Sequence, residues 1–141
     1  MPSEGARKLP PMMTVSEFHA WEGDGTGKRY ELAEGQLRAM APPNDTHGTI
    51  QTNLTRTISN HLIAARPKCR LVSTPGIAPH LRGDWNHRIP DVGITCALNL
   101  PGMGMMPDPL LLIEILSPGN SNDTWSNISL YSTVPSVQEI L

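Results

Sequence analysis

One charged residue stands inside an otherwise aliphatic segment of this chain. Glu114 lies within 110–116, where every other residue is Leu or Ile. An unpaired carboxylate in a hydrophobic interior is costly, so such a group is normally paired, neutralised or bound to a metal ion. A second carboxylate, Asp91, lies near the start of the preceding apolar segment, 89–96. Both segments have the length and composition of β-strands.

The spacing of strands makes these two acids a candidate pair. Alternate residues of a strand share a face, which places Asp91 with Gly93 and Thr95. Neighbouring strands lie about 5 Å apart. If the two strands pair in the right register, Asp91 and Glu114 converge, and two carboxylates suit a hard cation such as Mg²⁺.

The same residues allow a structural alternative. Glu114 could form a buried ion pair with an arginine, such as Arg70 or Arg88. A lone acid in a strand is more often paired than catalytic, so the residues taken alone favour this alternative.

Composition limits the other classes of function. The chain has 141 residues and a formal net charge of −2, which suits one small domain and gives no overall basic field for nucleic acid. A local basic patch remains compatible with DNA binding. Most of the basic residues are expected to be solvated surface charges, among them Arg56, Arg66, Lys68, Arg70, Arg82 and Arg88.

The two cysteines, Cys69 and Cys96, lack the spacing of metal ligands. We expect them to be reduced core residues of a cytoplasmic protein rather than a disulfide. No apolar run approaches the roughly 18 residues of a membrane span, so no membrane partner is expected.

The chain in order predicts a disordered leader over 1–11 and a single domain over 12–141. Thr14 to Glu17 fits a capping box, which predicts a short helix. Residues 29–32 and 36–40 alternate polar and apolar side chains around a tight turn, which predicts a hairpin. A long helix is expected over 46–65, with a stripe that faces the core: Ile50, Leu54, Ile58 and Leu62.

The second half of the chain predicts mainly strands. Short strands are expected over 69–73 and 76–81, followed by a polar loop over 82–88. The two acid-bearing strands come next. A helix over 124–131 and the start of another strand over 137–141 complete the pattern.

Several strings in this order resemble the Uma-two family of restriction-endonuclease-like proteins in the PD-(D/E)XK superfamily. The resemblance covers residues 14–141. It implies a mixed α/β (α+β) fold with a restriction-endonuclease-like core, in which helices flank a mixed β-sheet behind an N-terminal helix and hairpin. The strings are 29–35, with Arg-Tyr-Glu-Leu and a later Gly, His47 after a Pro/Asn loop, 88–92, 108–109 leading to 114–118, Tyr131, and 135–136.

This resemblance implies an endonuclease that hydrolyses DNA phosphodiester bonds with Mg²⁺ or Mn²⁺. Asp91 and Glu114 would be metal ligands, together with the backbone carbonyl of Ile115. Glu31 and His47 match positions near the site. DNA would be the partner, and a homodimer is expected.

Two departures from the family pattern support an alternative function. The family's catalytic Lys falls at Asn127, between Asp123 and Tyr131, and an amide has no charge and carries no proton near neutral pH. Such a loss commonly lowers rates by about 10²–10⁴. The chain also ends at Leu141, inside a strand, which suggests C-terminal truncation. The alternative is therefore a catalytically dead nuclease-fold domain that binds DNA or protein, or a remnant, in which Asn127→Lys is expected to restore cleavage.

Overall fold

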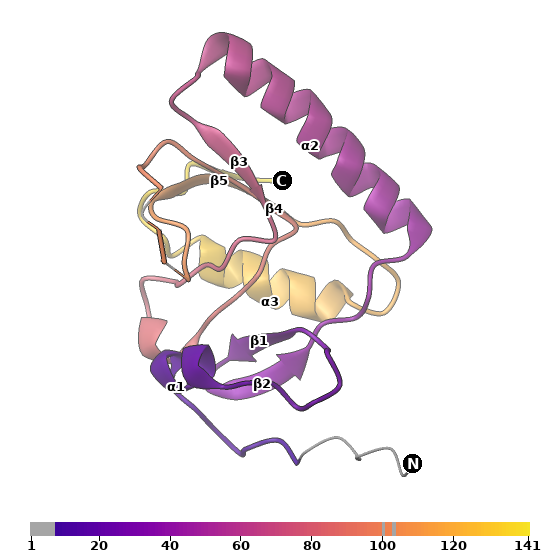
Figure 1. Ribbon diagram of the computed structural model, residues 1–141, viewed down its shortest axis with the longest axis vertical. Helices are drawn as coiled ribbons and strands as arrows, with labels where there is room; N and C mark the ends of the chain where they lie inside the picture. The colour runs from indigo at the N-terminus through magenta and orange to yellow at the C-terminus, as the bar shows by residue number, and fades with distance from the viewer. Residues whose placement is uncertain (1–7, 100, 103) are drawn as a thin grey trace.

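Two β-sheets, joined and flanked by helices, form the fold (Figure 1). The structure is a computed structural model that describes residues 8–99, 101–102 and 104–141, so most of the expected leader lies outside the described residues. The helices are α1 (Val15–Ala20), α2 (Asp45–Ala65) and α3 (Ser121–Tyr131), with a 3₁₀ turn η1 (Gly83–Trp85). The strands are β1 (Tyr30–Ala33), β2 (Gln36–Ala39), β3 (Arg70–Ser73), β4 (Val92–Thr95), β5 (Pro109–Ile113) and β6 (Glu139–Ile140).

The N-terminal segment forms the predicted helix and hairpin. Thr14 caps α1, and its backbone N–H donates a 2.6 Å hydrogen bond to the carboxylate of Glu17, which completes the capping box. Strands β1 and β2 pair antiparallel through a two-residue turn. Glu34 and Gly35 in that turn have φ values of 51° and 80°, the left-handed conformation that such tight hairpins require.

The larger sheet has the strand order β3-β4-β5-β6. Strands β3, β4 and β5 pair antiparallel, whereas β5 and β6 are parallel. A parallel connection needs a crossover, and α3 supplies it between β5 and β6. The sheet is therefore mixed, as expected, and helices flank it (Figure 1).

The main apolar core lies where α3 and the segment after it cover the sheet. Leu112 of β5 and Tyr131 of α3 are completely buried, and Ile77 and Val134 complete the cluster. This core fixes α3 against β5, which later determines where the polar residues of α3 lie.

Asn44 is the N-cap of helix α2. The side chain of Asn44 accepts a 2.8 Å hydrogen bond from the backbone N–H of His47. Only part of the expected apolar stripe is buried: Leu62 is buried, but Ile50 is 40% exposed. The difference arises because α2 packs chiefly against the edge strand β3 and not across the whole sheet.

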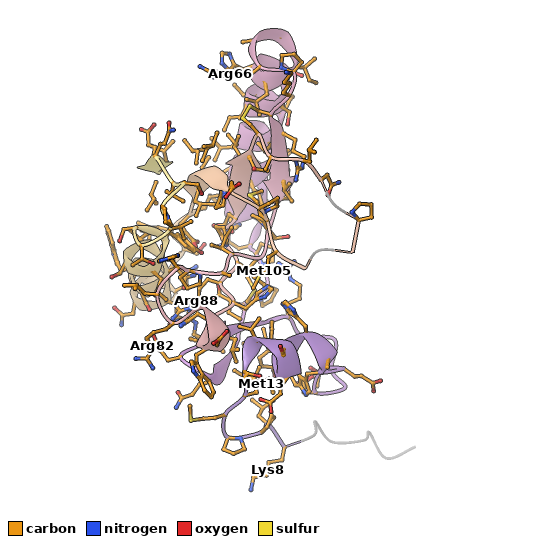
Figure 2. The ribbon with its side chains drawn as sticks, turned by 90° about the vertical axis from the view of Figure 1, so that its left-hand side faces the viewer. Lys8, Met13, Arg66, Arg82, Arg88 and Met105 are labelled. Atoms are coloured by element: carbon orange, nitrogen blue, oxygen red, sulfur yellow. A yellow bond between two sulfur atoms is a disulfide. The ribbon has the colours of Figure 1, made fainter. Side chains whose placement is uncertain are left out.

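The segment between β3 and β4 differs from expectation. Residues 76–81 form no strand, and Ile77 pairs only with Arg88 as an isolated bridge. Prolines at positions 75 and 79 remove backbone donors from this stretch, which limits a ladder. Residues 86–88 are buried rather than looped into solvent, and Arg88 lies inside the fold (Figure 2).

The prediction of reduced core cysteines was wrong, because Cys69 and Cys96 form a disulfide. Arg70 pairs with Thr95 at the end of the β3–β4 ladder, so the two cysteines immediately beyond face each other. Cys96 is exposed, and the bond closes one end of this strand pair. Within the described residues, no helix has the length and apolar character needed to cross a membrane.

Candidate active site

A cavity of about 460 Å³ lies where the hairpin, the start of α2, the start of β4 and the first half of α3 meet. It opens at the end of the sheet opposite the disulfide. The five side chains that the sequence suggested all line it: Glu31, His47, Asp91, Glu114 and Asn127.

The register of β4 and β5 brings the two acids together. Val92 pairs with Ile113, so Asp91 and Glu114 occupy the next position on either strand, just beyond the ladder. The predicted ion pair of Glu114 with an arginine is wrong for the described part of the chain. Glu114 Oε1 instead accepts hydrogen bonds from the hydroxyl of Tyr131 (2.8 Å) and from Nδ2 of Asn127 (3.3 Å).

The pKa of Glu114 is raised to about 8, chiefly by burial. The negative charges of Asp91 and Glu31 contribute to this rise, and the hydrogen bonds from Tyr131 and Asn127 oppose it. With no cation beside it, Glu114 is therefore mostly protonated at neutral pH.

Asp91 is held in one orientation by contacts on both carboxylate oxygens. Its Oδ1 lies 3.0 Å from Nε2 of His47, and its Oδ2 accepts a 2.6 Å hydrogen bond from the backbone N–H of Ile115. Its backbone carbonyl accepts from the side chain of Gln51 at 2.9 Å. The start of α2 thus positions Asp91 from one side and the end of β5 from the other.

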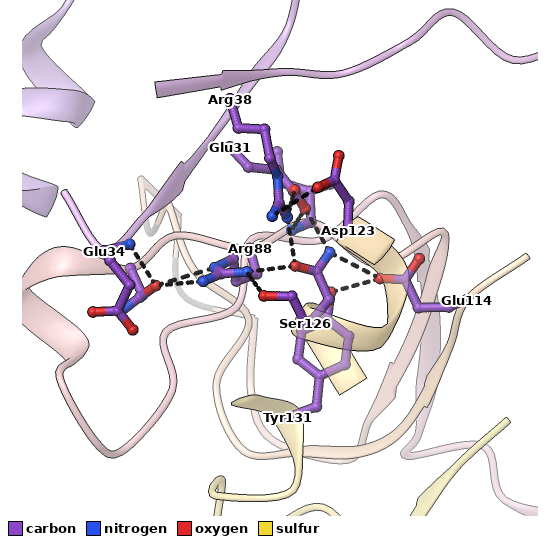
Figure 3. Close-up of polar contacts among 11 residues, drawn as sticks. Glu31, Glu34, Arg38, Arg88, Glu114, Asp123, Ser126 and Tyr131 are labelled. Atoms are coloured by element: carbon purple, nitrogen blue, oxygen red, sulfur yellow. Dashed lines mark hydrogen bonds and ion pairs between the residues drawn. The ribbon is translucent and has the colours of Figure 1, made fainter. Parts of the chain in front are cut away.

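Glu31 and Asn127 form the second half of the site (Figure 3). Glu31 Oε1 accepts hydrogen bonds from the backbone N–H of Ile89 (2.8 Å) and from Nδ2 of Asn127 (3.0 Å). Glu31 Oε2 pairs with Arg38 at 2.6 Å. The hairpin, β4 and α3 are therefore tied together through one carboxylate.

Two arginines near the site have contacts that the sequence did not predict: Arg38, which was not considered, and Arg88, which was considered only as a surface charge or as a partner of Glu114. Arg38 lies directly opposite Glu31 in the hairpin register and lines the cavity. Opposite charges facing each other across a predicted hairpin were the one signal in the sequence that could have indicated it. Arg88 carried no such signal, because its acceptors Asn86, Ser126 and Asn127 are neutral residues.

The carboxylates at the cavity suit a magnesium-like ion better than a zinc-like one. Among the described residues, no group of three or more His, Cys, Asp or Glu side chains is placed to hold a metal ion of any kind, so protein side chains alone do not make the closed shell of a structural zinc site. Mg²⁺ is usually bound through one or two carboxylates, with waters and substrate phosphates completing its shell. Asp91 and Glu114 are two such carboxylates, and the negative charge of Asp91 is one of the causes that raise the pKa of Glu114, after burial.

Comparison with solved structures identifies a nuclease-like fold. A crystal structure from Anabaena variabilis ATCC 29413, described as a "putative nuclease belonging to DUF820", matches with a TM-score of 0.62 and 20% sequence identity. The match covers 84% of this chain and 66% of that chain, so this chain spans just under two thirds of its length. At this identity the likeness establishes the fold alone.

Sequence comparison then identifies the family. The model of the Uma2 family, described as "Putative restriction endonuclease", matches residues 15–141. The chain belongs to the Uma2 family, as its motifs indicated. No protein of curated function matches the chain.

Proposed function

We propose that this protein is an endonuclease that uses Mg²⁺ or Mn²⁺ to hydrolyse phosphodiester bonds of DNA. One observation carries the proposal: Asp91 and Glu114 leave adjacent strands at the same level and line one cavity. Two descriptions support it: the Uma2 family is described as a restriction endonuclease family, and the solved structure with a similar fold is described as a nuclease.

The side chains of Asp91 and Glu114 would hold the cation, with the backbone carbonyl of Ile115 as a further ligand. When bound, such an ion polarises a phosphoryl oxygen and lowers the pKa of its water. Glu114 would release its proton as the ion binds, because a carboxylate ligand must be ionised. His47 and the N–H of Ile115 keep the Asp91 carboxylate oriented throughout.

The cavity also has groups that suit a DNA phosphate. Arg29 and Arg38 line it together with the acids, so positive charge lies beside the proposed cation site. A local basic group of this kind allows DNA binding in a chain whose net charge is −2.

A second candidate function follows from Asn127. An uncharged amide at this buried position leaves the site without the lysine that the family resemblance implies. The second candidate is a nuclease-fold domain that binds metal and DNA, or a protein partner, without cleavage.

Thermal unfolding with and without millimolar Mg²⁺ or Mn²⁺ tests the proposal, followed by nicking of supercoiled plasmid DNA. A ligand that binds the folded state raises its stability. We expect both ions to raise the Tm of the wild type and to support nicking, and Asp91→Asn to abolish both effects. Asp84→Asn is the matched control, because Asp84 is exposed and lies outside the cavity lining.

The outcomes separate the two candidates. A metal-dependent rise in Tm without nicking, accompanied by DNA binding, would favour the inactive domain. No rise in a wild-type protein that melts cooperatively would overturn the metal-dependent mechanism.

A further inference from the structure

Arg38 provides a positive charge that faces the cavity from the hairpin. We propose that Arg38 is the residue that binds the DNA phosphate, and that Asn127 is the residue that positions it. This inference rests on the proposed function and deepens it, since it names the cationic group that contacts the substrate.

Arg38 is the best placed of the basic residues that line the cavity. His47 uses Nε2 to contact Asp91, and Arg29 is exposed with only a 3.5 Å contact to Thr74. Arg88 is buried in the core and does not line the cavity. Arg38 is intermediate: its side chain is 21% exposed and is anchored to residues of the site.

The contacts of Arg38 hold one side of its guanidinium and leave the rest available. One terminal nitrogen donates to Glu31 (2.6 Å) and to Asn127 (2.7 Å). The other lies 3.3 Å from Asp123, whose side chain is 53% exposed. Pairs with an exposed acid contribute little stability and are readily exchanged. Within the described residues, Nε has no hydrogen-bond acceptor, so Arg38 keeps donors for a phosphate.

Asn127 determines where that guanidinium lies. Its side-chain oxygen accepts hydrogen bonds from Arg38 and from Arg88, each at 2.7 Å. Its side-chain nitrogen donates to Glu31 and Glu114. All hydrogen-bonding positions of the amide are therefore occupied. Because Asn86 fixes Arg88 in the core, Arg38 is the one of the two arginines bound by Asn127 that lines the cavity; Figure 3 shows both contacts.

The charges that line the cavity explain why a phosphate would need Arg38. Four carboxylates line the cavity, those of Glu31, Asp91, Glu114 and Asp123, against two guanidinium groups. A divalent cation would balance only the remaining charge, and a DNA phosphate brings more negative charge. Loss of Arg38 would leave the occupied site net negative, which disfavours the substrate.

A purely structural role for Arg38 is the competing explanation. Arg38 would then serve only to neutralise Glu31 and Asp123. The two roles differ in the salt dependence of DNA binding, because each phosphate contact releases counterions and steepens the slope of log K against log salt by about 0.9. Neutralisation inside the protein leaves that slope unchanged.

The experiment measures binding of a labelled DNA duplex over a range of salt, with Ca²⁺ in place of Mg²⁺. We expect Arg38→Gln to reduce the magnitude of the slope by about 0.9 and Arg38→Lys to preserve it. Arg66→Gln is the matched control, because Arg66 lies at the far end of α2 from the cavity (Figure 2) and should keep the wild-type slope. Thermal melts establish that each variant is folded.

Each outcome decides a separate point. An unchanged slope in folded Arg38→Gln, or an equal loss in Arg66→Gln, would overturn the role of Arg38 and leave the proposed function standing. Absence of DNA binding by the wild type would overturn both. If Arg38→Gln does not fold because Glu31 is left unpaired, Arg38→Gln with Glu31→Gln is compared with Glu31→Gln alone, and the same change in slope is required.

Discussion

The side-chain oxygen of Asn127 accepts a 2.7 Å hydrogen bond from Arg88, a residue that is only 2% exposed. A cation this deep in a fold needs acceptors on every side, and Asn86 and Ser126 supply the others. Asn127 therefore does more than line a cavity. Its side-chain oxygen accepts a hydrogen bond from a core arginine, and its side-chain nitrogen donates hydrogen bonds to two acids of the candidate site, Glu31 and Glu114.

This contact predicts the effect of Asn127→Lys. The ammonium would lie beside Arg38 and Arg88 and would remove the acceptor that both share, so we expect a loss of roughly 2–4 kcal/mol in the free energy of unfolding. We therefore no longer expect Asn127→Lys alone to restore cleavage. Arg38→Met combined with Asn127→Lys should be more stable than Asn127→Lys alone.

Urea denaturation with plasmid nicking measures both effects. Asn122→Lys, at an exposed position of the same helix, is the control and should change stability by less than about 0.5 kcal/mol. A stable Asn127→Lys protein with increased nicking would contradict the prediction.

Tyr131→Phe removes the hydroxyl that donates to Glu114 and keeps the buried ring. That hydrogen bond lowers the pKa of Glu114, so its loss should raise this pKa further above about 8. At pH 7 a cation must then displace a more tightly held proton. We expect a smaller Mg²⁺-dependent rise in Tm than in the wild type, with the difference shrinking as the pH rises past 8.

The matched control is Tyr30→Phe, which removes a hydroxyl that donates to Asp24 (2.6 Å), outside the cavity lining. Each variant should lose about 1 kcal/mol of stability from one hydrogen bond. Equal Mg²⁺ responses at pH 7 in both variants would argue against a role for Tyr131 in tuning Glu114.

Reduction of the Cys69–Cys96 bond should destabilise the fold. The two cysteines lie 27 positions apart, and a closed loop of that length is worth roughly 3.5 kcal/mol through restriction of the unfolded chain. We expect dithiothreitol to lower the urea midpoint of the wild type and to leave that of Cys69→Ala with Cys96→Ala unchanged. The same midpoint for oxidised and reduced wild type would refute the stabilising role.

His87 predicts a loss of stability in mild acid. Its pKa is lowered to about 4, chiefly by burial and in smaller part by His19, whose Nε2 lies 3.0 Å from Nδ1 of His87. The unfolded chain would take up the proton near pH 6.5, so it binds more protons than the folded state between pH 6.5 and 4. Stability should fall across this window as the pH is lowered, by roughly 2 kcal/mol after allowance for partial solvent access.

Urea titrations from pH 7 to pH 4 measure this loss. His87→Gln should flatten the curve relative to the wild type, whereas His80→Gln should not, because His80 is exposed. Parallel curves for the wild type and His87→Gln would show that acid acts elsewhere.

Local signals in the sequence predicted much of the fold. Thr14 and Glu17 form a complete capping box, and Asn44 and Pro67 lie at the two ends of α2, so neighbouring residues are enough to indicate where these helices begin or end. The isolated charge of Glu114 indicated the strand pair whose ends line the cavity. The family and the mixed sheet were confirmed.

What the sequence did not predict depends on contacts between distant segments. Arg88 is buried because Asn127, 39 positions later, brings an acceptor to it. The disulfide depends on the register of β3 and β4, which no local pattern of Cys69 or Cys96 reveals. The roles of the cavity residues in catalysis stay predictions, since they depend on a cation and a substrate.

The bond between Asn127 and Glu31 joins residues that are 96 positions apart. Closing so long a loop costs entropy, and contacts between such distant positions generally slow folding. We therefore expect the cavity to be completed late, after the hairpin and the sheet have formed. During synthesis the growing chain would carry Glu31 and Asp91 before α3 emerges, so any hydrolytic activity would be delayed until α3 had been made.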